Sequence, residues 1–156
     1  MAHGLDTKQY LDTVCAMLRE GQTAVPVPVA GVSMRPFLRN GDVVYLDLPP
    51  KKLRKGDIFL FTRPNGQYVL HRLHKIQKDG SYLMLGDSQL IPESVREEQI
   101  RAAVTFARIR GEVVKKSSFR WWCFAYPWRW LAPWRTQVGD ILYKLHHRHD
   151  KKSPDS

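Results

Sequence analysis

Two cysteines and no long apolar run are the first limits that this 156-residue sequence sets. Cys15 and Cys123 lie far apart and outside any CxxC or metal-ligand spacing, so they build no disulfide framework. A reducing compartment is therefore the simpler expectation. A membrane-spanning helix needs about 20 apolar residues, whereas the longest uncharged stretch, residues 21–34, is short and contains two prolines. We expect neither a membrane-spanning helix nor a signal-peptide core.

Acidic residues are outnumbered, because 25 Lys and Arg stand against 15 Asp and Glu, which gives a formal net charge of +10. The excess is greatest in residues 115–156, which carry nine basic and three acidic residues. This balance fits an anionic partner, whether nucleic acid, a membrane surface or an acidic protein. A hydrophobic content of 43% is enough for a folded core and too high for a disordered chain.

The apolar residues change their spacing along the chain, and this change predicts the fold. Residues 6–20 predict one amphipathic helix, with apolar side chains at helical spacing: Tyr10, Leu11, Val14, Met17 and Leu18. From Val25 onward, short apolar runs separated by Gly, Pro, Asn and Asp predict β-strands. Asn65-Gly66 and Asp79-Gly80 are hairpin signals. Residues 97–114 fit a short helix or a further strand equally well.

These patterns predict a mainly β chain of the α+β class in three parts. Residues 1–21 form an N-terminal amphipathic helix, and residues 22–114 form a compact β body without internal repeats. Residues 115–156 form an aromatic and basic C-terminal extension. Its last residues, 150–156, are polar and charged, and we expect them to be disordered.

A serine, a histidine and a carboxylate are the candidate catalytic residues. Ser33 alone is a weak signal, because most loop serines do no chemistry. His71 lies inside the apolar run YVLHRL, where a lone histidine is most simply a core residue bonded to a carbonyl. Here Ser33 upstream and Asp87 downstream supply the partners of a general base, which a histidine can be near neutral pH. The three residue types fit a nucleophile, base and acid, although spacing does not show that they meet.

The order of the surrounding motifs resembles a known family. The motifs are G-x-S-M-x-P at 31–36, Gly-Asp at 41–42, G-D-I-x-x-F at 56–61, V-L-H-R at 69–72, and L-G-D at 85–87 with an acidic residue six positions on. This order resembles the signal peptidase I superfamily, and most closely the branch found in archaea and the endoplasmic reticulum. That branch uses histidine where bacterial signal peptidases and LexA-like autoproteases use lysine. The resemblance covers residues 22–114 and implies a coiled antiparallel β peptidase fold that hydrolyses peptide bonds.

Matched position by position, the resemblance implies that Ser33 is the nucleophile, His71 the base and Asp87 the acidic partner. Glu93 falls where that branch often has a second aspartate and is the candidate second acid. Gly31 stands where signal peptidases usually have a serine whose hydroxyl helps to hold the oxyanion, as it does in LexA-like autoproteases. We therefore expect an oxyanion hole made mainly of backbone N–H groups, that of Ser33 among them.

The residues around the serine are assigned to the oxyanion hole and substrate pocket: Gly31, Val32, Met34 and Pro36. Met34 is expected to pack near the pocket and Pro36 to stiffen the turn. Arg72, directly after the base, is expected to pair with Asp42 or Asp87 rather than to take part in catalysis.

The resemblance also bears on location and substrate. Signal peptidases normally carry a membrane anchor before the serine motif, where this chain has its amphipathic helix. We therefore expect a serine endopeptidase that trims a leader from a peptide or protein precursor. Its expected location is the cytoplasm, with peripheral binding at the membrane surface as the alternative. Two alternatives stay open: a peptidase-like fold that binds peptides without cutting them, and a basic adaptor whose tail carries the function. Self-cleavage at Ala30-Gly31 is not expected, because the pair lies too close to Ser33.

Residues 119–134 contain all five tryptophans, interleaved with arginines. Trp and Arg suit a membrane interface, and residues 119–135 are equally suited to contact a protein partner. Stacking on single-stranded nucleic acid is less favoured, because a peptidase body gives no reason to bind bases. The histidines of residues 146–149 lack the carboxylate or cysteine spacing of a metal site. We expect neither a metal nor a cofactor.

Overall fold

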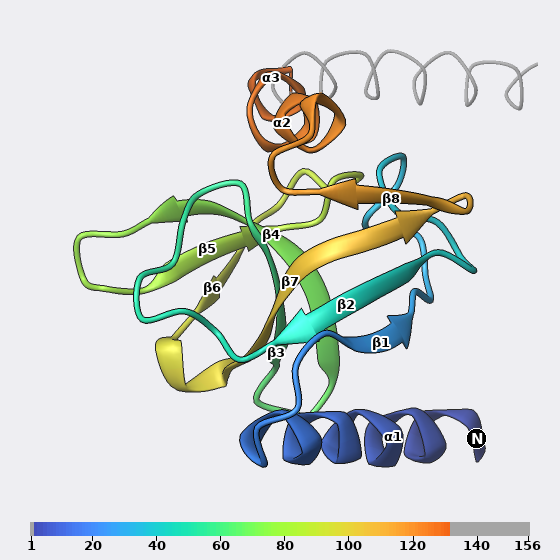
Figure 1. The fold of residues 1–156 in the computed structure, drawn as a ribbon. Coiled ribbons are helices and arrows are strands. Elements are labelled where there is room, and N and C mark those ends of the chain that lie inside the picture. The colour runs from blue at the N-terminus through green and yellow to red at the C-terminus, as the bar shows by residue number, and fades with distance from the viewer. Residues whose placement is uncertain (1, 132–156) are drawn as a thin grey trace, which may run out of the picture.

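A computed structural model describes residues 2–131 of the chain and shows one coiled antiparallel sheet of eight strands (Figure 1). The strands are β1 (Val25–Pro28), β2 (Val43–Asp47), β3 (Ile58–Thr62), β4 (Tyr68–Ile76), β5 (Tyr82–Leu85), β6 (Glu93–Val95), β7 (Ile100–Ile109) and β8 (Glu112–Lys115). The helices are α1 (Ala2–Arg19), the short 3-10 helix η1 (Glu97–Gln99), α2 (Phe119–Ala125) and α3 (Pro127–Trp130). The helix α1 lies at one end of the sheet, and α2 and α3 lie at the opposite end (Figure 1).

The predicted fold class is confirmed, and so are the elements with the clearest sequence patterns. The amphipathic N-terminal segment is α1, and both predicted hairpins form, with Gly66 and Gly80 at φ values of 81° and 84°. Residues 97–114, which the sequence left open, begin with η1 and then form the β7–β8 hairpin. The three-residue strand β6 was not predicted, because so short a segment carries no visible alternation.

The strands follow the order β1-β2-β7-β3-β4-β5-β6, and β8 pairs with β7. The long strand β7 is therefore central and is hydrogen-bonded to β2, β3 and β8 along its length. Register shifts in its pairings with β2 and β3 bend the sheet. This bending brings β1, at one edge of the sheet, close to β4, as the cavity described below shows.

The buried apolar side chains form two clusters. The first contains the apolar stripe of α1, the inner side chains of β1 and β2, and Trp121 and Ala125 of α2. The second contains Phe59 and Phe61 of β3 with Leu73, among others. Because neighbouring side chains of a strand point to opposite faces, β3 contributes to both clusters. Cys15 is buried, Cys123 is half-buried, and both are free thiols.

No helix within residues 2–131 is both long and apolar enough to cross a lipid bilayer.

Candidate active site

Ser33 lies in the turn that follows β1 and is half-buried. Gly31, two residues earlier, has a φ of 93°, a left-handed conformation that glycine adopts without strain and a serine does not. A Cβ at Gly31 would touch no atom within 4 Å, so the backbone conformation rather than crowding favours glycine there. The backbone conformation at position 31 therefore suits glycine, and a serine at that position would be strained.

The backbone of Ser33 is held by the segment that follows β5. The N–H of Ser88 donates to the carbonyl of Ser33 at 2.9 Å, and its hydroxyl donates to the same carbonyl and to that of Val32, both at 3.0 Å. Gly86 lies so close that a Cβ on it would stand 2.6 Å from the Ser33 carbonyl oxygen. Residues 86–88 thus hold the backbone of Ser33 in place.

His71 is in the middle of β4 and is 1% exposed. It lies opposite Phe59 of β3, and its ring is 5.9 Å from that of Phe61. Its Nδ1 is 3.5 Å from Oε1 of Glu93 and makes no hydrogen bond to another of the residues described. The sheet register explains this approach, because Leu73 pairs with Met84 and Met84 with Glu93, which places the glutamate on the same face as His71.

Glu93 is in turn bound by Arg63, which sequence reasoning missed. The guanidinium donates from Nε to Oε2 of Glu93 at 2.7 Å and from Nη2 to Oε1, and its Nη1 donates to Oε1 of Gln67 at 2.8 Å. Arg63 directly follows β3 in the β3–β4 hairpin, so it lies on the hairpin that carries His71. That position, a lone arginine beside the Asn65-Gly66 turn, is the only signal in the sequence that could have singled it out.

The protonation states of this group follow from its surroundings. The pKa of His71 is lowered to about 4, mainly by burial. The charge of the Glu93 carboxylate opposes this shift, and the charge of Arg63 adds to it. The hydrogen bonds from Arg63 hold the pKa of Glu93 below its usual value. At neutral pH the imidazole is therefore neutral and the carboxylate ionised, which are the forms that a general base and its orienting acid require.

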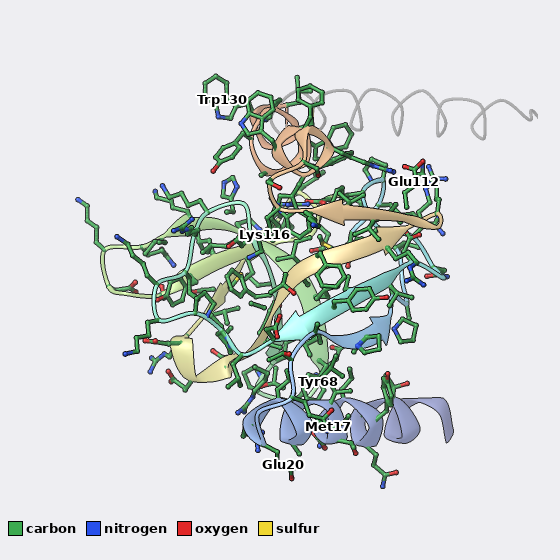
Figure 2. The ribbon with its side chains drawn as sticks, viewed as in Figure 1. Met17, Glu20, Tyr68, Glu112, Lys116 and Trp130 are labelled. Carbon is green, nitrogen blue, oxygen red and sulfur yellow. The ribbon has the colours of Figure 1, made fainter. Side chains whose placement is uncertain are left out.

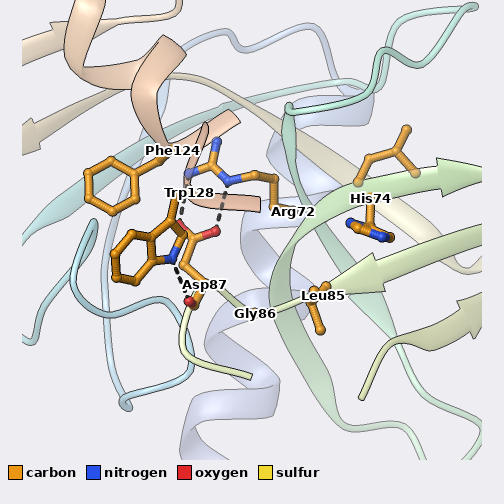
Figure 3. A pocket seen from close by; sticks show the side chains of 8 residues that line it. Arg72, His74, Leu85, Gly86, Asp87, Phe124 and Trp128 are labelled. Carbon is orange, nitrogen blue, oxygen red and sulfur yellow. Dashed lines mark hydrogen bonds and ion pairs between the residues drawn. The ribbon is translucent and has the colours of Figure 1, made fainter. Parts of the chain in front are cut away.

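Asp87 lies elsewhere, and its predicted pairing with His71 is wrong. Its two carboxylate oxygens accept hydrogen bonds from Nε and Nη2 of Arg72 at 2.9 and 2.8 Å (Figure 3). Arg72 and His71 are neighbours on β4 and point to opposite faces of the sheet. The carboxylate beside His71 is that of Glu93, the candidate second acid, whereas Asp87 belongs to the buried ion pair that was one of the two expected for Arg72.

The contacts around the Arg72–Asp87 pair indicate a structural role. Arg72 also donates to the carbonyl of Gly56 at 2.7 Å and lies 4.9 Å from the ring centre of Phe37. The indole N–H of Trp128 donates to the backbone carbonyl of Asp87 at 2.8 Å (Figure 3). The pair thus joins the sheet, the Gly56 turn and α3. Asp42 joins two turns, because its carboxylate accepts the N–H of Arg39 in its own turn and the N–H of Arg110 in the β7–β8 turn.

Ser33 and His71 line one cavity of about 320 Å³. The predicted pocket residues Gly31, Val32 and Met34 also line it, whereas Pro36 does not. Its other walls come from the end of β1 and the following residues, the start of β4, and single residues of the hairpin and the loop after β5: Val29, Ala30, Arg63, Gln67, Tyr68, Val69, Leu70 and Gln89. The structure therefore brings the predicted serine and histidine to one cavity, with the Arg63–Glu93 pair beside the histidine.

A family model described as Peptidase S24-like matches residues 2–114 of the chain. The chain belongs to the Peptidase S24-like family. The matched region contains α1, the strands β1 to β7, most of β8, and the residues Ser33, His71 and Glu93. Membership supports a peptidase-like fold and a hydrolase of the serine peptidase type, and it confirms the wider relationship to LexA-like and signal peptidase I-like proteins. No curated protein and no solved structure matched the chain.

Metal chemistry has no visible site in the described part of this S24-like chain. Within residues 2–131, no group of three or more His, Cys, Asp and Glu side chains is placed to hold a metal ion. The histidines of residues 146–149 and the expected disordered end, residues 150–156, lie outside the described residues.

The low pKa of His71 predicts a pH dependence of folding. The unfolded histidine titrates near pH 6.5, whereas the folded one titrates near pH 4, so the folded chain binds fewer protons between these values. This contribution to stability is complete above pH 6.5 and is lost as the pH falls towards 4. We expect the free energy of unfolding to drop by about 2 kcal/mol from this residue between pH 7 and pH 5. Urea unfolding at both pH values measures the drop, and the same drop in His71→Gln would contradict its assignment to His71.

The contact of Gly86 with Ser33 predicts a loss of activity when residue 86 gains a side chain. An alanine at position 86 must push the Ser33 carbonyl away, since its Cβ would stand at 2.6 Å. A displacement of about 1 Å at a reacting group can cost about 10²-fold in rate, and we expect kcat of Gly86→Ala to fall by that order. The control is Gly80→Ala, which strains a remote hairpin with φ of 84°. An unchanged kcat in Gly86→Ala, or an equal loss in Gly80→Ala, would show that residues 86–88 do not position the serine.

Proposed function

We propose that this chain is a serine endopeptidase that hydrolyses a peptide bond in a precursor or leader peptide by a Ser–His mechanism. The observation that carries the proposal is the shared cavity of Ser33 and His71, with the Nδ1 of that histidine 3.5 Å from the Glu93 carboxylate. Ser33 is the nucleophile, His71 the general base, and Glu93 the acid that orients the imidazole. Arg63 acts as a positioning residue, because it holds Glu93 by two hydrogen bonds.

Acylation needs a neutral imidazole and a fixed tautomer. With Glu93 beside Nδ1, the proton of the neutral ring is favoured on Nδ1, and Nε2 is left to accept the proton of the Ser33 hydroxyl. The Ser33 Oγ then bonds to the carbonyl carbon of the substrate, and the carbonyl becomes an oxyanion. When this intermediate collapses, the C–N bond breaks and the imidazolium gives its proton to the leaving amine, so that an acyl ester remains on Ser33.

Deacylation repeats these steps with water. His71 accepts a proton from a water molecule, whose oxygen attacks the ester carbonyl. The C–Oγ bond then breaks, the proton returns to Ser33, and the product leaves with a new carboxylate. Glu93 remains ionised throughout and stabilises the imidazolium by its charge, in keeping with its lowered pKa.

Backbone N–H groups are the proposed oxyanion donors. The glycine at position 31 offers no hydroxyl, and among residues 2–131 the N–H of Ser33 has no hydrogen-bond acceptor. This N–H is therefore available to the oxyanion that forms on the carbonyl attacked by the same residue. A donor held by the backbone needs no side-chain ordering. The hydrogen bond from the Ser88 hydroxyl to the Val32 carbonyl, which shares a peptide plane with the Ser33 N–H, fixes its direction.

Strand edges beside the cavity that no other described residue pairs favour an extended peptide as substrate. Leu73 of β4 donates its N–H to Asp57 on the β3 side, so alternation points the N–H and C=O groups of Leu70 and Tyr68 to the other side. β5 pairs β4 only from Arg72 to Ile76 and leaves that part of the edge open. Across the cavity, Val29 donates towards β2, and Ala30 therefore faces outward. An extended segment, such as a leader, can add between the two edges.

An apolar groove extends this proposed peptide site towards α1. A cavity of about 430 Å³ shares Val29, Ala30, Tyr68 and Leu70 with the site cavity. Its remaining walls are mostly apolar side chains of α1 and the sheet: Thr7, Tyr10, Leu11, Val27, Pro28, Val44, Leu46 and Leu60. The groove favours substrates with apolar side chains on one side of the bond that is cut.

A peptide library tests the proposal. The full chain and its Ser33→Ala variant are incubated with a defined library of unstructured peptides, and new termini are identified by mass spectrometry. We expect cuts in the wild-type reaction only, within segments that carry apolar residues. Binding of the same peptides by both forms without any cut would replace the enzyme with the peptide-binding alternative. Equal cutting by both forms would reject Ser33 as the nucleophile.

A further inference from the structure

An exposed aromatic face lies on α2 and α3. These helices are at the end of the molecule away from α1 (Figure 1). It consists of five exposed side chains: Phe119, Trp122, Tyr126, Trp130 and Leu131. Phe119 and Trp130 are 76% and 79% exposed, and Trp130 points away from the body of the protein (Figure 2). Large apolar side chains grouped in this way are uncommon on a soluble surface and mark a contact site.

The opposite side of the same helices is firmly attached to the sheet. Trp121 and Ala125 are buried in the core, and Gly56 approaches so closely that a Cβ on it would stand 2.7 Å from that of Ala125. Trp128 is bonded to the carbonyl of Asp87. The tryptophans of α2 and α3 are therefore divided between anchoring the helices and facing outward. The exposed rings are held in place by the fold rather than left on a loose tail.

A basic groove adjoins the aromatic face. It has a volume of about 540 Å³ and lies between α2 and the loop before β3. Lys52, Arg54 and Lys55 of that loop line it together with Trp122 and Tyr126, two rings of the aromatic face. Lys116 also lines the groove and is paired with Asp57 at 2.9 Å, whereas the other three cations are exposed. The exposed cations of the basic groove therefore lie beside two rings of the aromatic face.

We infer that the aromatic face and the basic groove together bind the surface of an anionic phospholipid bilayer. The exposed cations complement acidic headgroups, and indole and phenol rings favour the boundary between headgroups and acyl chains. Leu131 suits the acyl chains and has no ring on which a base could stack, which favours a bilayer over single-stranded nucleic acid. The anchored helices would present these rings to the bilayer without an ordering step.

Vesicle sedimentation of the full chain tests this inference. The probes are vesicles of phosphatidylcholine with phosphatidylserine, and vesicles of phosphatidylcholine alone. We expect binding to the anionic vesicles that weakens with added salt. Trp122→Ala combined with Trp130→Ala should weaken binding by at least about tenfold. Lys52→Gln combined with Lys55→Gln should also weaken it by about tenfold or more, since each basic residue near an anionic surface contributes about fivefold.

Matched controls lie at the opposite end of the molecule. Tyr10→Ala removes an exposed ring from α1, and Arg19→Gln removes an exposed charge from its last turn. Both should bind as the wild type does. Absence of vesicle binding by the wild type, or equal binding by all variants, would overturn the inference. Binding of a single-stranded oligonucleotide in place of vesicles would overturn it in favour of nucleic acid. The lysine pair lies on an exposed loop, so it keeps the test decisive if the tryptophan pair fails to fold.

Discussion

Replacement of His71 by asparagine should lower kcat/KM for peptide hydrolysis by about 10⁴-fold or more. Asparagine cannot accept the Ser33 proton or return it to the leaving amine, and both transfers depend on this one side chain. In the proposed mechanism the neutral imidazole is the working form, in keeping with the burial that lowers the pKa of His71 to about 4. The activity of the wild type should consequently persist well below pH 6.5 and decline towards pH 4, as far as the fold remains intact.

The matched control for this variant is His74→Asn, on the same strand. The side chain of His74 lies with Arg72 and Asp87, on the face opposite His71. Its replacement should leave kcat/KM close to the wild-type value, measured with a peptide that the wild type cuts. An equal loss in both variants would point to general damage of β4, and full activity in His71→Asn would reject a histidine base.

Asp87→Asn should destabilise the protein by about 3–5 kcal/mol, because it leaves the buried Arg72 guanidinium without its ionised partner. Both side chains of this pair are 4% exposed. Glu93→Gln should cost much less stability, because the Arg63–Glu93 pair is about 30% exposed on each side. Its main effect should be on kcat, which we expect to fall by about 10³-fold or more with the loss of the charge beside His71.

The two carboxylates can thus be separated by measuring two quantities on each variant. Urea unfolding gives the free energy of unfolding, and peptide hydrolysis at a temperature where both variants are folded gives kcat. The expected pattern is a stability defect for Asp87→Asn and an activity defect for Glu93→Gln. The reverse pattern would restore Asp87 as the partner of His71 and contradict the assignment made from the structure.

Much of the fold follows from local patterns, because spacing and turn residues act over short stretches of chain. The helical stripe of α1, the strands β1 to β5 and the Asn65-Gly66 and Asp79-Gly80 hairpins were all predicted in this way. The β7–β8 segment stayed ambiguous, since Val104, Phe106 and Ile109 fit two periods. The sheet order was beyond reach, because β7 joins β2 to β3 through pairings distant in sequence.

The site was predicted in its residue types and only partly in its contacts. Ser33 and His71 line the same cavity. The exchange of Asp87 for Glu93 depends on register, since Leu73, Met84 and Glu93 align across three strands. A bulge between β4 and β5 and a three-residue β6 set that register, and neither has a sequence signature. The sequence did predict that Arg72 pairs with Asp42 or Asp87. The pair with Asp87 explains why this carboxylate does not lie beside His71.

Gly31 is a position where the structure adds a physical reason to what the sequence shows. The glycine at position 31 was noted because it supplies no hydroxyl. The structure adds that its φ of 93° disfavours any side chain, so the turn and the missing donor have one cause. In the proposed mechanism the backbone N–H of Ser33 is the oxyanion donor, and Gly86 and Ser88 hold that residue in place.

The central claim, that Ser33 is an activated nucleophile, is tested most directly by trapping its acyl ester. The full chain is mixed with an activated ester of a peptide that it cuts, quenched in acid within the first turnover, and analysed by mass spectrometry. The mechanism predicts one acyl group per chain, located on Ser33, absent from Ser33→Ala and formed far more slowly by His71→Asn. An acyl group on another residue, or peptide hydrolysis that continues in Ser33→Ala, would contradict the claim.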